Sequence, residues 1–378
     1  MIPSCISSRV WATVVVALLS VSSSSACAGG ADEPEAGAVP DHVAVEEWRL
    51  GRADGGGPDV FAMPAALEVD AHGRLYVLDA QAGEVRVFDA DGGWVRTLGR
   101  SGAGPGELAQ PMGMALSPEG RLWVVDPGNA RFMVWDTAGT LVGAEPRASG
   151  LTAYPWPGRF DARGGLWDVA SGSGGLDAPP TLVRLDPASR APERVALPPF
   201  RPARFTAGRG GVMVTARVPF APELAWALDG EGRAWSGTTD RYRLVLRDPS
   251  GDTLRVVERA VTRMSVAPAE RDSAARALDW FTAQGGRVDV SRIPREKPAF
   301  VSLRTDDRNR LWVRATPAPG AAGAVFDRFG PDGRPEARVV LPMAHDDAMP
   351  LVFRGDHAYA VVVADTGVPQ VVRLRISG

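Results

Sequence analysis

The stretch GRLWVVDPGNARFMVWDTAGTLV, from Gly120 to Val142, decides the fold of this protein because an earlier stretch repeats its pattern position for position. The earlier copy is GRLYVLDAQAGEVRVFDADGGWV, from Gly73 to Val95. Both read Gly-Arg-Leu-aromatic-Val-x-Asp, then seven variable residues, then Val-aromatic-Asp, two more residues and a Gly. Such self-similarity indicates a chain built from copies of one structural unit.

The same pattern recurs along the rest of the chain, with a period of about 45 residues and two longer steps in the middle that imply insertions. Its central pairs are Leu75-Tyr76, Leu122-Trp123, Leu166-Trp167, Ala234-Trp235, Leu311-Trp312 and Ala358-Tyr359. A proline precedes each pair and suits the first residue of a strand, because proline donates no ladder hydrogen bond. These prolines are Pro64, Pro111, Pro155, Pro222, Pro298 and Pro350.

Each copy reads as four short strands, which in the second copy are MGMALS, RLWVVD, ARFMVWD and TLVGAE. The Gly, Pro, Asn and Asp between them are the residues that turns require. Repeats of this length with four strands each are typical of a β-propeller. The sequence therefore predicts an all-β, six-bladed β-propeller with four-stranded blades, and its regular repetition argues against a β-sandwich.

The last copy predicts how the ring closes. Val371–Ile376 aligns with a third strand, and no fourth strand follows it. The segment His42–Leu50 lies before the first copy and has no other partner, so we expect it to supply the missing outer strand and remove an open edge. We expect Val43, Val45 and Trp48 to provide its apolar contacts.

The second copy resembles the NHL-repeat family of propellers. It shares that family's Pro, short apolar strand, Gly-x-Leu-aromatic-Val-x-Asp, Asn-x-Arg at Asn129 and Arg131, and third strand ending in aromatic-Asp. The first copy departs from the pattern at Ala82 and Glu84, and the other copies match only at the strand cores. The whole chain is also similar to exported six-bladed propeller proteins of unknown function from environmental bacteria.

Two insertions interrupt the repeat. The longer one, at about 262–296, contains a predicted helix at 268–284, with Pro268 in its first turn, Glu270 near its N-terminus and Gly285 after its end. This helix could cap the propeller or fill a gap between blades, or it could form a lid over the channel mouth. The other insertion, at 171–218, reads as long loops with one extra or displaced strand in GGVMVTARV.

The N-terminus reads as a processing signal followed by a tether. Residues 1–26 form a predicted signal peptide, 27–41 a flexible tether and 42–378 the propeller. Ala26-Cys27-Ala28 fits ordinary cleavage, whereas Cys27 is alternatively the lipidated first residue of a bacterial lipoprotein. We expect an exported protein in the periplasm or on the outer membrane or cell surface, with the lipid as its membrane contact. Cys5 lies within the signal, so no internal disulfide is expected.

Composition and motifs argue against several kinds of chemistry. The formal net charge is -3 and basic residues are scattered, so nucleic-acid binding is not predicted. Of the positions just after the six prolines, only Glu223 could hold a cation, so we expect no metal and no cofactor. The four histidines show no metal-binding spacing and are expected at the surface. They are His42, His72, His345 and His357.

Aspartates recur at the strand ends, where they could bind calcium or cap turns. Capping explains them better, because an Asp side chain hydrogen-bonds the turn backbone two residues on. The residues concerned are Asp79, Asp126, Asp89, Asp136, Asp186 and Asp248. Similarly, the tryptophans at the repeat's aromatic position are expected to pack the blades.

These observations favour a non-catalytic binding or scaffold propeller of the cell envelope, which is a monomer and engages a protein, peptide or glycan. The alternative is a lactonase-like hydrolase or lyase with a site at the channel mouth. In either case the candidate ligand-binding residues at the channel mouth are Met112, Trp156, Arg159 and Glu223.

Overall fold

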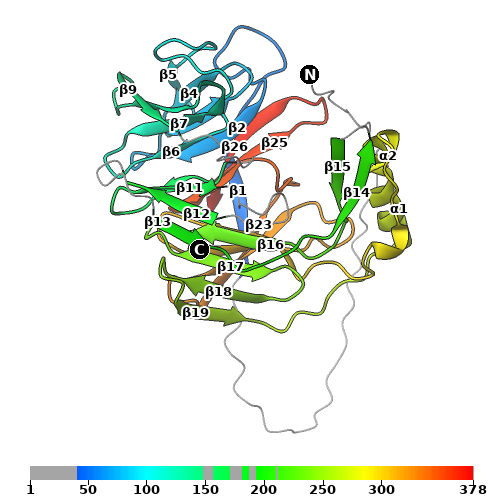
Figure 1. Cartoon of the computed structure of the whole chain (residues 1–378). Coiled ribbons are helices and arrows are strands. Elements are labelled where there is room, and N and C mark those ends of the chain that lie inside the picture. The colour runs from blue at the N-terminus through cyan, green and yellow to red at the C-terminus, as the bar shows by residue number, and fades with distance from the viewer. Residues whose placement is uncertain (1–40, 148–155, 171–180, 187–192, 210–211, 378) are drawn as a thin grey trace, which may run out of the picture. The chain divides into compact units, whose positions relative to one another are not determined.

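The structure is a computed structural model that describes residues 41–147, 156–170, 181–186, 193–209 and 212–377 (Figure 1). The predicted signal peptide at 1–26, Cys27 and all of the predicted tether except Asp41 lie outside these residues. Among the described residues, no helix is long and apolar enough to cross a membrane.

The chain forms the predicted six blades of four strands each. Blades 1 to 5 follow the order of the sequence, whereas blade 6 takes its outer strand from the N-terminus. Blades 1 and 2 consist of β2 Pro64–Val69, β3 Leu75–Asp79, β4 Glu84–Phe88, β5 Trp94–Leu98, β6 Gly113–Leu116, β7 Leu122–Asp126, β8 Arg131–Trp135 and β9 Leu141–Pro146. Blades 3 and 4 consist of β10 Arg159–Phe160, β11 Leu166–Ala170, β12 Thr181–Leu185, β13 Glu193–Ala196, β16 Leu224–Leu228, β17 Ala234–Thr238, β18 Arg243–Arg247 and β19 Thr253–Glu258. Blades 5 and 6 consist of β20 Phe300–Thr305, β21 Leu311–Ala315, β22 Ala324–Phe329, β23 Pro335–Leu341, β24 Leu351–Arg354, β25 His357–Val363, β26 Pro369–Ile376 and β1 Asp41–Leu50. Single 3-10 turns lie at Pro127–Asn129 and Val290–Arg292.

A hydrophobic cluster fills each of the six interfaces between successive blades, including the one between blade 6 and blade 1. The repeat's aromatic residues belong to these clusters, as predicted: Trp167, Trp235 and Trp312 are fully buried. Trp312 stacks on Phe353 of the next blade, with 3.9 Å between ring centroids. The blades thus close into a ring that is held by packing between neighbours.

The predicted closure by the N-terminal strand is confirmed. β1 pairs antiparallel with β26 from Ala44↔Ile376 to Leu50↔Val371. Its first residues also pair in parallel with β23, at Asp41↔Arg338 to Val43↔Val340, so β1 joins blades 5 and 6 into one sheet.

The expected apolar contacts of this strand were partly wrong. Val43 and Val45 are 58% and 51% exposed, whereas Ala44 is buried in the cluster between blades 5 and 6. Because side chains alternate between the faces of a strand, burial of Ala44 places both valines on the solvent side. Trp48 packs against the neighbouring cluster, and its indole N–H donates to the Ala90 carbonyl at 3.1 Å.

The two insertions pack against each other (Figure 1). The first forms the hairpin β14 Arg204–Arg209 and β15 Val212–Arg217, which contains the predicted extra strand. The second forms α1 Pro268–Arg276 and α2 Asp279–Ala283. Phe281 and Leu278 share a buried cluster with Phe205 and Ala216 of the hairpin. The helical insertion was therefore predicted correctly, although the helix breaks between α1 and α2.

Candidate functional site in the axial channel

A cavity of about 720 Å³ lies where the inner strands of all six blades meet. Its lining draws on β2, β6, β10, β16, β20 and β24 together with the turns that follow them. None of the residues of α1 or α2 lines it, so the helical insertion does not act as a lid over this cavity. A volume of this size is typical of pockets for small ligands.

The strand register defines a ring of six equivalent positions in the channel, each paired with the repeat's aromatic residue on the next strand. These positions are Glu68, Ala115, Arg159, Ala227, Arg304 and Val352. All six line the cavity. Blades 1, 3 and 5 therefore contribute charged side chains to the ring, and blades 2, 4 and 6 contribute small apolar ones.

Glu68 is the one carboxylate of this ring. Its side chain is half-buried and makes no ion pair within 4.0 Å in the described part of the chain. Enclosure in the channel raises the pKa of Glu68 to about 7, although Arg159, Arg354 and the Val69 N–H act to lower it. A carboxyl group with such a pKa changes its charge near neutral pH.

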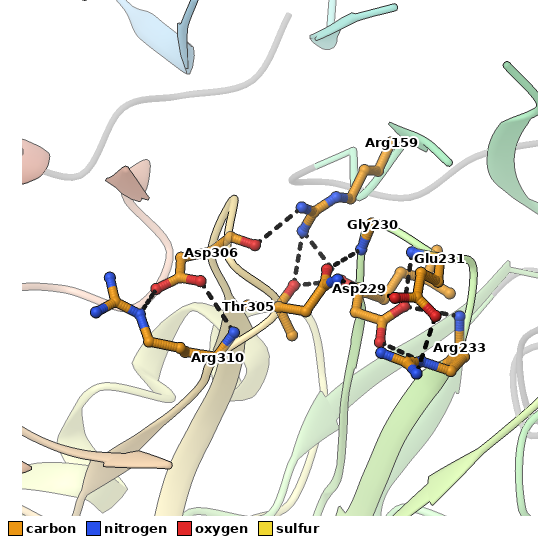
Figure 2. A network of polar contacts seen from close by, with 10 residues as sticks. Arg159, Asp229, Gly230, Glu231, Arg233, Thr305, Asp306 and Arg310 are labelled. Carbon is orange, nitrogen blue, oxygen red and sulfur yellow. Dashed lines mark hydrogen bonds and ion pairs between the residues drawn. The ribbon is translucent and has the colours of Figure 1, made fainter. Parts of the chain in front are cut away.

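Arg159 of blade 3 joins three blades through hydrogen bonds to blades 4 and 5 (Figure 2). Its Nη1 donates to the Thr305 hydroxyl at 2.7 Å and to the Leu228 carbonyl at 3.2 Å, and its Nη2 donates to the Asp306 carbonyl at 3.1 Å. Thr305 in turn donates to Leu228. Burial lowers the pKa of Arg159, but a guanidinium remains charged at neutral pH. Arg159 therefore links blade 3 to blades 4 and 5 in addition to bringing a positive charge into the channel.

Arg304 belongs to a polar cluster in the channel wall between blades 5 and 6. Its Nη1 donates to the Ser302 hydroxyl at 3.0 Å and lies 3.4 Å from Asp347, to which Ser302 donates at 2.6 Å. Behind them lies His345, which is buried rather than at the surface, so that expectation was wrong. Burial and the nearby Arg304 lower the pKa of His345 to about 4, because both disfavour the imidazolium.

Arg354 ends β24 and is a further cation of the channel lining. It is half-buried, and within the described residues its guanidinium has no hydrogen-bond or ion-pair partner. Its electrostatic influence reaches Glu68 on the neighbouring β2. Arg354 and Glu68 are thus opposite charges that face the same cavity from adjacent blades without pairing.

The repeat that identified the fold also builds the rim of the channel. A buried Asp follows the inner strand in four blades, accepts from backbone N–H groups two and four residues on, and pairs with an Arg. In Figure 2 these pairs are Asp229 with Arg233 at 2.7 Å and Asp306 with Arg310 at 2.6 Å. Trp312 donates to the same Asp306 carboxylate at 2.9 Å. The repeated arginine is therefore a structural counter-ion.

Five of the six aspartates expected to cap turns hydrogen-bond backbone N–H groups, whereas the turn after Asp186 lies outside the described residues. Asp89, Asp136 and Asp248 cap the turns after their third strands. Asp79 and Asp126 instead hold the segment that leads into the inner strand, through Met63 and Gln110. Among the residues that the structure describes, no group of three or more His, Cys, Asp or Glu side chains is arranged to hold a metal ion.

The structure places the four sequence-predicted site residues in different surroundings. Trp156 and Arg159 line the cavity, and Trp156 is buried with its indole N–H on Asp168 at 2.6 Å. Met112 packs between blades 2 and 3 and is outside the cavity lining. Glu223 is also outside it; burial raises its pKa, and Arg217 lies 3.6 Å away.

Sequence reasoning missed Glu68, Arg304 and Arg354 because it sampled the residues just after the marker prolines, where the inner strands begin. The ring lies further along each strand. Because the hairpin register is fixed, each ring position lies eight residues before the repeat's aromatic residue in the first five copies. Counting back from Tyr76, Trp167 and Trp312 would have found Glu68, Arg159 and Arg304.

The fold and the channel together define this protein as a six-bladed β-propeller. The DUF5128 family, described as a 6-bladed beta-propeller, matches residues 65–145, which include both copies that carry the fullest repeat. No curated protein sequence matches the chain.

Two solved structures show the same fold at low sequence identity, and a third gives a lower score. A member of the DUF4221 family from Bacteroides vulgatus is 12% identical with a TM-score of 0.53, over 89% of this chain and 98% of that one. A protein from Bacteroides fragilis described as exported is 10% identical with a TM-score of 0.50, over 90% of this chain and 100% of that one. Virginiamycin B lyase from Staphylococcus aureus is 11% identical with a TM-score of 0.46, over 87% of this chain and 99% of that one.

Proposed function

We propose that this protein is a ligand-binding propeller of the cell envelope, exported through its N-terminal signal and anchored by a lipid on Cys27. Its ligand is a peptide, a glycan or a segment of a protein that enters the axial channel. The observation that carries this proposal is the cavity of about 720 Å³, lined by all six inner strands, with charged side chains at the ring positions of blades 1, 3 and 5. Few precisely placed polar groups in a largely preformed pocket are characteristic of binding sites.

Filling the channel tests the proposal. Val352→Trp enlarges a side chain of the ring on blade 6, so we expect it to abolish binding of a ligand selected from peptide and glycan arrays. Val256→Trp on the outer strand β19 is the matched control, because Val256 is 46% exposed. The melting temperature checks that both variants are folded, because Val352 also packs against the cluster between blades 6 and 1. Equal binding by the two variants would place the ligand outside the channel and overturn the proposal.

A hydrolase or lyase remains the second candidate, and the observation that favours it is Glu68. A carboxyl group with a pKa of about 7 in a cavity suits general acid–base catalysis at neutral pH. The enzyme hypothesis predicts turnover of a lactone or ester that is lost in Glu68→Gln. A binding module instead retains its ligand unchanged, so analysis of the bound ligand after incubation separates the two functions.

A further inference from the structure

The charged groups of the channel define the chemistry of its ligand more narrowly than its shape does. This inference rests on the proposed function, because it assumes that the ligand occupies the channel. The deciding feature is which charged side chains are already engaged by protein groups. Arg159 is fixed by three oxygen acceptors on blades 4 and 5. The carboxylates of Asp70, Asp161 and Asp306 are each paired with their own arginine.

The remaining cations, Arg304 and Arg354, line the cavity from the neighbouring blades 5 and 6. Arg354 has no protein partner among the described residues, and Arg304 engages Ser302 and Asp347 through Nη1 alone. Its Nε and Nη2 have no partner in the part of the chain that the structure describes. Guanidinium groups bind carboxylates through paired N–H donors, which gives strong and oriented hydrogen bonds. This side of the channel therefore presents donors to an anion.

Glu68 faces these cations from blade 1. The cavity lining also includes apolar surface, since Trp226 of blade 4 belongs to it and is only half-buried. A simple inorganic anion would leave both Glu68 and this aromatic surface without a partner. An organic acid that carries a hydroxyl or amide N–H beside its carboxylate would contact all three.

We propose that the channel binds an organic acid, whose carboxylate is held by Arg354 and Arg304 and whose hydroxyl or N–H donates to Glu68. Sugar acids and peptides with a free C-terminus share this chemistry. The apolar part of the ligand packs on Trp226. No covalent step is involved.

This arrangement makes binding depend on pH through Glu68. The carbonyl oxygen of protonated Glu68 can accept the ligand's hydroxyl or N–H, whereas ionised Glu68 repels the ligand carboxylate, so the ligand binds better to the protonated form. Glu68 titrates near pH 7, and Arg159 and Arg354 are the cations that act on it. Burial lowers the pKa of Arg304, but a guanidinium remains charged at neutral pH. Asp347 is held by Arg304, and His345 is neutral above pH 5 because its pKa is about 4. Affinity should therefore fall as pH rises through 7, and binding should take up protons.

Matched pairs of small probes test the ligand class. D-glucuronate is compared with D-glucose, and N-acetylalanine with N-acetylalaninamide, by calorimetry at pH 6 and pH 8. In at least one pair we expect the acid to bind and its neutral partner to bind roughly 10- to 100-fold more weakly, as loss of a charge-assisted hydrogen bond implies. The pair that responds distinguishes a sugar acid from a peptide terminus. Absence of binding by both acids at millimolar concentration would overturn the inference.

Three variants test the residues. Arg354→Gln should lower affinity for the acid roughly 10- to 100-fold, whereas Arg255→Gln on the exposed strand β19 should leave it unchanged. Glu68→Gln imitates the protonated carboxyl, so its affinity should stay constant from pH 6 to pH 8. A wild-type pH dependence in Glu68→Gln, or full affinity in Arg354→Gln, would contradict the assignment.

The inference can fail while the proposed function stands. If a neutral ligand binds and Val352→Trp abolishes its binding, the channel is the site but its ligand is no organic acid. If Val352→Trp leaves every ligand bound, the site lies elsewhere and both proposals fail.

Discussion

At the scale of single residues, the buried aspartate after the inner strand pairs with an arginine that comes from different positions of the repeat in different blades. In blade 5 the buried Asp306 pairs with Arg310, four residues further on. In blade 3 the equivalent carboxylate, Asp161, has Gly165 at that position and pairs instead with Arg184 of β12 at 2.6 Å. Burial acts to raise the pKa of Asp161, but hydrogen bonds from Arg184, the Gly165 N–H and Trp167 outweigh it. The net pKa is lowered, so the carboxylate stays ionised. The arginine thus comes from a different strand position in blade 3, and the buried ion pair is present in both blades.

Because Arg184 supplies the counter-ion that position 165 would supply by analogy with blade 5, we expect the stability effects of substitutions at positions 165 and 184 to be strongly coupled. A Cβ at Gly165 would lie 2.2 Å from the Arg184 guanidinium carbon, so Gly165→Arg should destabilise the wild type. Arg184→Ala should cost about 3–5 kcal/mol, because it leaves the buried Asp161 without its partner. In the double variant, the new arginine at position 165 of blade 3 can pair with Asp161 in the way that Arg310 pairs with Asp306 in blade 5.

We therefore expect the double variant to recover much of the stability that Arg184→Ala loses. The measurement is a double-mutant cycle by denaturant unfolding, with coupling energy of about 1–3 kcal/mol. Gly165→Lys in the Arg184→Ala background is the control, because lysine lacks the bidentate geometry of arginine. Additive effects of the two substitutions would show that the two arginine positions are not interchangeable.

At the scale of elements, β1 does more than complete blade 6. It pairs with β26 on one side and with β23 on the other, so the strand farthest from the C-terminus in sequence holds blades 5 and 6 together. Only Ala44 of its first residues is buried. The stabilisation by β1 therefore comes from two ladders of backbone hydrogen bonds and from Trp48, which packs edge-to-face on Tyr359.

A chain that begins at Gly51 should unfold much more easily or aggregate, because both β23 and β26 would have an open edge. The melting temperature and the oligomeric state, compared with a chain that begins at Asp41, provide the measurement. An unaltered melting temperature would show that the blades close without β1.

Point substitutions in β1 separate its buried face from its exposed face. Ala44→Asp should be strongly destabilising because it buries a charge without a partner. Val45→Asp should change the free energy of unfolding by about 0.5 kcal/mol or less, because Val45 is 51% exposed. Equal effects of the two substitutions would contradict the register of the strand.

At the scale of the whole molecule, the proposed location depends on Cys27, which is outside the described residues. We expect wild-type protein to partition with membranes, because a lipidated cysteine with more than one acyl chain suffices for stable anchoring. Cys27→Ser should move the protein to the soluble fraction. Ser24→Ala, which leaves the cysteine in place, is the matched control. Unchanged membrane association of Cys27→Ser would remove the lipid from the proposal.

The sequence by itself determined the number of blades, the closure by the N-terminal strand and the helical insertion. These follow from local patterns: the six aromatic positions, the period-two strands and the prolines that precede them all act within about 45 residues of chain. Of its four candidate site residues, Trp156 and Arg159 line the cavity, since both lie close to the start of an inner strand.

Only the tertiary structure decided which side chains meet in the channel. Glu68, Arg304 and Arg354 are separated by up to 286 residues (354 − 68) and line one cavity because a ring brings the inner strands of different blades together. The tertiary structure also decided that Val45 faces solvent and that His345 is buried, because burial depends on the neighbouring blade rather than on the strand's own pattern. The raised pKa of Glu68 has the same origin: its cause is enclosure by six strands, which no single copy of the repeat contains.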